Sequence, residues 1–80
     1  MDKQKCSNIL NSILEEIDLY SYINNPNEII EMDSLTMVEL IVIIESKFGC
    51  EFSLDELDFD NFRTYNTILL MVFNKVSSNE

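Results

Sequence analysis

The chain has 80 residues, room for one domain at most, and its hydrophobic fraction of 46% is normal for a globular fold. Fifteen acids against five bases give a formal net charge of −10, which argues against nucleic acid, whose phosphates are bound by Lys and Arg. Histidine, the commonest general base and metal ligand, does not occur, so neither an enzyme nor a metal site is expected. Glycine and proline occur once each, which favours helices over a turn-rich β fold.

The two cysteines, Cys6 and Cys50, do not form a C-x-x-C pair, so we interpret them as buried, reduced thiols. No stretch reaches the roughly 18 apolar residues of a membrane span, and the first residues do not resemble a signal peptide. We therefore expect a soluble, monomeric, cytoplasmic protein that contacts neither membrane nor nucleic acid.

Apolar residues first recur at steps of three and four, which predicts an amphipathic helix of about four turns. Its apolar positions are Cys6, Ile9, Leu10, Ile13, Leu14 and Ile17. The periodicity then fails, and residues 18–32 are predicted to form a long loop with turn chemistry at residues 24–27. Five apolar residues should pin this loop across the helices: Tyr20, Tyr22, Ile23, Ile29 and Ile30.

A second helix is predicted to begin after Asp33, whose carboxylate can accept the free amides of a first turn. It should run from Leu35 to near Phe48 and end at Gly49, because glycine readily adopts the left-handed conformation that ends helices.

This second helix has more apolar residues than one buried face needs. One arc of about 100° forms the predicted core stripe: Met37, Leu40, Ile41, Ile44 and Phe48. A second arc, which we call the outer strip, has acids on its flanks; the strip is Leu35, Val38 and Val42, and the flanking acids are Glu39 and Glu45. Two interpretations remain open, since the strip is either a docking surface or is covered by the loop of residues 18–32.

Further along, Ser53 followed three residues later by Glu56 is a capping-box pattern that predicts a short helical turn. Another turn is predicted around residues 60–63, seated in the core by Phe59 and Phe62. Thr64 should then cap a last helix with a continuous core face: Tyr65, Ile68, Leu69, Val72, Phe73 and Val76.

The predicted fold is therefore all-α, a small three- to four-helix bundle that forms a single domain over residues 1–80, with frayed ends at 1–4 and 77–80.

Ser34 lies in the first turn of the second helix, next to its cap. An anion attached to its hydroxyl would be stabilised by unsatisfied amides and by the positive end of the helix dipole. The alternative is that Ser34 serves only as a helix-capping residue beside Asp33.

Residues 33–40 read D-S-L-T-M-V-E-L, a specific motif, and the match continues through Glu45, Phe48, residues 50–52 and residues 64–65. The sequence resembles the acyl carrier and peptidyl carrier protein family from its first helix to Val76. The resemblance implies an acyl-carrier-protein-like fold and a covalent 4′-phosphopantetheine arm on Ser34, with Asp33 as part of the motif. It also implies that a phosphopantetheinyl transferase and acyl- or aminoacyl-loading and downstream enzymes dock on the second helix, through Leu35, Val38, Glu39, Val42 and Glu45.

Such a protein carries thioesters and does not catalyse. The resemblance implies a discrete carrier of a polyketide, nonribosomal peptide or fatty-acid-type pathway, although Thr36 stands where fatty-acid carriers often have an acid. Glu31 stands where the family usually has glycine, three residues before the serine. This departure keeps an alternative open, an acidic helical interaction module that has the carrier fold but receives no arm.

Overall fold

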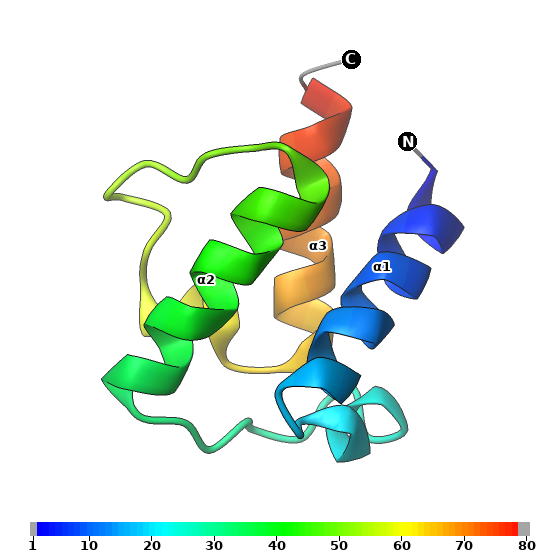
Figure 1. Ribbon diagram of the computed structural model, residues 1–80, viewed down its shortest axis with the longest axis vertical. Helices are drawn as coiled ribbons and strands as arrows, with labels where there is room; N and C mark the ends of the chain where they lie inside the picture. The colour runs from blue at the N-terminus through cyan, green and yellow to red at the C-terminus, as the bar shows by residue number, and fades with distance from the viewer. Residues whose placement is uncertain (1, 79–80) are drawn as a thin grey trace.

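The computed structural model describes residues 2–78, and it is all-helical over this range, as the sequence predicts (Figure 1). Between residues 2 and 78, three α-helices and two short 3₁₀ helices follow one another: α1 (Lys3–Glu16), η1 (Tyr20–Ile23), α2 (Ser34–Phe48), η2 (Phe59–Phe62) and α3 (Tyr65–Ser78). Among the described residues, no helix has both the length and the apolar composition to cross a membrane, and no cluster of acids and thiols is arranged to hold a metal ion.

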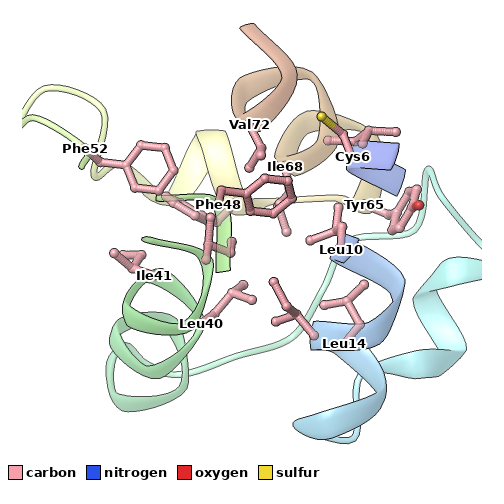
Figure 2. Close-up of a cluster of buried hydrophobic side chains, with 14 of the residues drawn as sticks. Cys6, Leu10, Leu14, Leu40, Ile41, Phe48, Phe52, Tyr65, Ile68 and Val72 are labelled. Atoms are coloured by element: carbon pink, nitrogen blue, oxygen red, sulfur yellow. The ribbon is translucent and has the colours of Figure 1, made fainter. Parts of the chain in front are cut away.

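The core lies between the three α-helices, where side chains from all of them point toward one another (Figure 2). Each helix contributes one stripe, because residues three and four apart share a face of a helix. The stripe of α2 is buried as predicted, and Leu40 and Ile44 are completely inaccessible. The Tyr65 hydroxyl joins α3 to α1, since it donates to Asn11 Oδ1 at 2.6 Å and lies 2.8 Å from Ser7 Oγ.

Helix ends follow the residues that cap them. The Asp2 carboxylate accepts the Lys5 amide at 2.8 Å, so α1 begins earlier than its apolar pattern. Thr64 caps α3 as predicted, because its Oγ1 accepts the Thr67 amide at 3.1 Å. The frayed ends at 1–4 and 77–80 stay a prediction: residues 3–4 and 77–78 belong to α1 and α3, and Met1, Asn79 and Glu80 lie outside the described residues.

Gly49 ends α2 as predicted. Its φ of 65° is left-handed, and its amide donates to the Glu45 carbonyl at 2.9 Å. A β-carbon added at Gly49 would meet no atom within 4 Å, so the requirement for glycine here is conformational and not steric.

Two features of the links between helices differ from the prediction. The loop of residues 18–32 contains the 3₁₀ helix η1, which is too short to produce a periodic pattern, and only Ile30 of its five apolar residues is fully buried. Phe62 is buried as expected, with 1% of its side chain exposed, but Phe59 is 51% exposed and does not plug the core. Phe62 packs edge-to-face against the buried Phe52 ring, with 6.3 Å between ring centroids.

Both cysteine side chains lie in the core, as predicted. Cys6 is completely inaccessible and Cys50 is 7% exposed. Burial disfavours the charged thiolate, and this desolvation raises the pKa of both thiols above the usual value.

Candidate functional site

The first turn of α2 is built by Asp33. Its backbone is extended, and its Oδ1 accepts the Thr36 amide at 2.8 Å while its carbonyl accepts the Met37 amide at 3.0 Å. The hydrogen bond from the Thr36 amide stabilises the carboxylate and holds the pKa of Asp33 below its ordinary value. Asp33 is therefore the cap of α2, as the sequence predicts.

Ser34 is the first residue of α2, and its side chain is exposed. Within the described part of the chain its hydroxyl has no hydrogen-bond partner, because Asp33 already performs the capping. The interpretation of Ser34 as a capping residue is therefore wrong. The Ser34 hydroxyl therefore lies exposed at the positive end of the helix dipole, without a hydrogen bond to any described residue.

The outer strip continues from Ser34 along the exposed face of α2. Leu35 is 77% exposed, Val38 55% and Val42 57%. The loop of residues 18–32 does not cover these side chains, so the interpretation of the strip as a covered surface is wrong. The strip is an apolar surface that starts at the serine and extends up the helix.

The two acids that flank the strip differ in environment. Glu39 is exposed, and among the described residues its carboxylate has no partner. Glu45 is half-buried, and its Oε2 accepts the backbone amide of Phe52 at 3.0 Å. The sequence pattern predicts the same role for both acids, contact with partner enzymes. The contact between residues 45 and 52 depends on the path of the chain after Gly49, and no local pattern encodes that path.

The segment that leads into Ser34 is fixed by two hydrogen bonds. The Ile30 amide donates to the Arg63 carbonyl at 2.7 Å, and the Glu31 amide donates to the Tyr22 hydroxyl at 3.3 Å. Asp18 is the one non-glycine residue with a positive φ in the described range, so Glu31 lies in ordinary backbone conformation. Glutamate at position 31 is therefore tolerated without backbone strain, and the approach to Ser34 does not require glycine.

This geometry fits a covalent arm joined through a phosphodiester. The serine hydroxyl is accessible, the surface beside it is open and apolar, and the helix dipole favours an attached anion. The chain has no histidine, the commonest general base, to activate the Ser34 hydroxyl.

Comparison with known proteins agrees with this geometry. The family described as phosphopantetheine attachment site (PP-binding) matches residues 28–72, which is more than half of the chain and includes α2 and most of its surroundings. Neither the search of curated proteins nor the search of solved structures found a match. The chain therefore belongs to the phosphopantetheine attachment family, whose members hold a covalent 4′-phosphopantetheine prosthetic group, and it is a carrier protein and not a catalytic enzyme.

Proposed function

We propose that Ser34 is the residue to which a phosphopantetheinyl transferase attaches the arm, and that the protein carries acyl or aminoacyl groups. The arm supplies a terminal thiol that forms thioesters. The observation that carries this proposal is the Ser34 hydroxyl, exposed and without a hydrogen-bond partner among the described residues at the N-terminus of α2. Tethering a cargo here would raise its effective concentration at each enzyme that docks on α2.

The other serines within the matched residues are less suitable. Ser53 is exposed, but its Oγ donates to Glu56 Oε1 at 3.0 Å. Ser46 is also exposed, but it lies in the last turn of α2, where the helix dipole is negative and disfavours an attached anion. Ser34 is the serine that combines a free hydroxyl with a favourable field.

Partners of this carrier would bind the outer strip together with Glu39. The three apolar side chains offer area to bury, and the exposed carboxylate and the net charge of −10 would attract basic surfaces. We assign this surface to the transferase, to acyl- or aminoacyl-loading enzymes and to downstream synthases of a polyketide, nonribosomal peptide or fatty-acid-type pathway. Two buried, reduced thiols support a cytoplasmic location, and we expect a monomer.

Intact mass spectrometry tests the attachment. Co-expression with a broad-specificity phosphopantetheinyl transferase should increase the mass by one arm in the wild-type chain and in Ser46→Ala, and by none in Ser34→Ala. Ser34→Ala should keep its helical circular dichroism, because the hydroxyl has no structural partner in the described residues. Modification of Ser34→Ala, or its unfolding, would contradict the assignment.

The unmodified interaction module remains the competing function. The sequence feature that favoured this module is Glu31, which stands where the family usually has glycine. Because Glu31 lies in ordinary backbone conformation, its presence gives no physical reason why the arm could not be attached. An unchanged wild-type mass in the same experiment would favour this module over the carrier.

A further inference from the structure

Glu45 lies on the edge of the outer strip, one turn after Val42, yet its carbonyl and one of its carboxylate oxygens accept hydrogen bonds from within the protein. Its carbonyl accepts the amides of Gly49 at 2.9 Å and Cys50 at 3.2 Å. Its carboxylate reaches further along the chain and accepts the Phe52 amide at 3.0 Å. One residue of α2 therefore holds three of the first four residues of the chain that leaves the helix.

The hydrogen bond to Phe52 fixes more than one amide. Phe52 is buried, and its ring packs edge-on against Phe62 of η2, with an interplanar angle of 88°. The position of Phe52 thus links the end of α2 to η2. Residues 49–64, which we call the α2–α3 segment, leave one end of α2, loop outward and return to the start of α3 (Figure 1).

A second contact holds the α2–α3 segment to α3. Glu56 Oε1 accepts the Ser53 amide at 2.8 Å and also the Lys75 ammonium at 2.8 Å, and Lys75 Nζ lies 6.0 Å from the centroid of the Phe52 ring. The segment is therefore tied to α2 through Glu45 and to α3 through Glu56. The tie at Glu45 is the one that borders the outer strip.

We propose that Glu45 is a positioning residue for partner docking, which acts by holding the α2–α3 segment beside the outer strip, whereas Glu39 acts on partners directly through its charge. The proposal rests on the proposed function of the strip. Because Glu45 Oε2 accepts the Phe52 amide, a change of the Glu45 side chain also changes how the α2–α3 segment is held, whereas a change at Glu39 affects charge alone. If Glu45 released Phe52, the segment would lose its tie to α2 at the border of the docking surface.

Two conservative variants separate the effect of the length of the Glu45 side chain from the effect of its charge. Glu45→Gln removes the charge but keeps a side-chain oxygen at the same distance from the backbone, whereas Glu45→Asp keeps the charge but is one methylene too short to reach the Phe52 amide. The measurements are hydrogen exchange of the Phe52 amide and the initial rate at which the transferase loads Ser34. The matched pair Glu39→Gln and Glu39→Asp is the control, since the Glu39 carboxylate has no hydrogen-bond or ion-pair partner among the described residues.

Positioning predicts opposite results at the two sites. Glu45→Asp should exchange the Phe52 amide about tenfold faster or more, as expected for losing a hydrogen bond to a charged group, and should load more slowly. Glu45→Gln should stay close to the wild type in both measurements. At position 39 the order should reverse, with Glu39→Gln slow to load, Glu39→Asp close to the wild type, and Phe52 exchange unchanged in both.

The proposal is overturned if Glu45→Gln loads slowly while Glu45→Asp does not, which is the result of a direct charge contact. It is also overturned if Glu45→Asp exposes the Phe52 amide but loads at the wild-type rate. Glu56→Ala tests the proposal at the contact between the α2–α3 segment and α3. It should loosen the same segment without altering the outer strip, and it should also slow the loading of Ser34. Failure of the wild-type chain to gain an arm would instead contradict the proposed function, and Phe52 exchange would still report whether the hydrogen bond exists.

Discussion

The two faces of α2 have nearly the same chemistry and opposite environments. Both consist mainly of aliphatic side chains, but Leu40 and Ile44 are inaccessible, whereas Leu35, Val38 and Val42 are more than half exposed. What separates them is angular position around the helix and not residue type. One apolar side of α2 forms part of the core and the other is left exposed, which is what the docking surface proposed above requires.

The sharpest test of this comparison exchanges one residue from each face for alanine. Leu40→Ala should lower the free energy of unfolding by about 2–5 kcal/mol, because it leaves a cavity in the core. Val38→Ala should change it by less than about 0.5 kcal/mol, since the side chain already contacts water, but it should slow the loading of Ser34. Urea denaturation followed by circular dichroism measures both energies. Equal losses would mean that Val38 belongs to the core.

Both faces of α2 end at Gly49, where the helix terminates. Gly49→Ala should cost about 1–2 kcal/mol of stability, because alanine strains at a φ of 65° although there is space for its β-carbon. Gly49→Asn should cost less, since asparagine adopts the left-handed conformation more easily. The same denaturation experiment distinguishes them. If alanine were harmless, the left-handed end would not be what terminates the helix.

The contribution of the Glu56 carboxylate to stability can be tested by varying the pH. The Lys75 ammonium and the Ser53 amide lower the pKa of Glu56 to about 2, from an unfolded value of about 4.3. The depressed folded pKa means that this stabilisation is complete above about pH 4.3 and is lost as the pH falls toward 2. Over that window, stability should fall more steeply in the wild type than in Glu56→Gln.

Lys75→Met provides the control for this titration, because it removes the ammonium that is the largest cause of the shift. When Glu56→Gln is introduced into a Lys75→Met background, its effect on the pH dependence of stability should shrink across the same window. An effect that persists unchanged would assign the shift to the Ser53 amide instead of the ion pair.

The smallest expected effect concerns the charge that surrounds the outer strip. Added salt shortens the Debye length from about 30 Å at 0.01 M to about 8 Å at 0.15 M, which relieves repulsion among uncompensated acids and should raise the melting temperature slightly. The same screening should slow the loading of Ser34, since it weakens the attraction of a basic partner. Melting temperature and initial loading rate, measured in one salt series, should move in opposite directions. A loading rate that ignores salt would leave recognition to the apolar strip alone.

The sequence predicted the parts of this molecule that depend on local periodicity and caps. The faces of α2, the cap at Asp33 and the left-handed end at Gly49 are confirmed, because each is encoded within a turn or two of helix. The short helix η1 was missed, although Leu19, Tyr22 and Ile23 have the spacing of a single helical turn. One turn is too little for periodicity to stand out from a loop.

What the sequence did not predict depends on contacts between distant segments. Residue type does not distinguish Phe59 from Phe62, but in the fold Phe62 is buried against Phe52 while Phe59 stays exposed. In the same way, Glu39 and Glu45 are equivalent on a helical wheel, and the path of the α2–α3 segment alone gives Glu45 an internal partner. The motif around Ser34 could be predicted from the sequence, but the different environments of Glu39 and Glu45 could not.

The burial of both cysteines has a practical consequence for labelling chemistry. Thiolates are the species that attack alkylating and disulfide-forming reagents. Cys6 and Cys50 are shielded by the core, and burial raises their pKa values so that they hold their protons more tightly than a free cysteine. On the folded protein, the sulfhydryl at the end of an attached arm would therefore react first. A maleimide dye added at neutral pH should mark the arm-bearing form selectively, report the fraction of molecules modified in a preparation, and label both cysteines only after the protein unfolds.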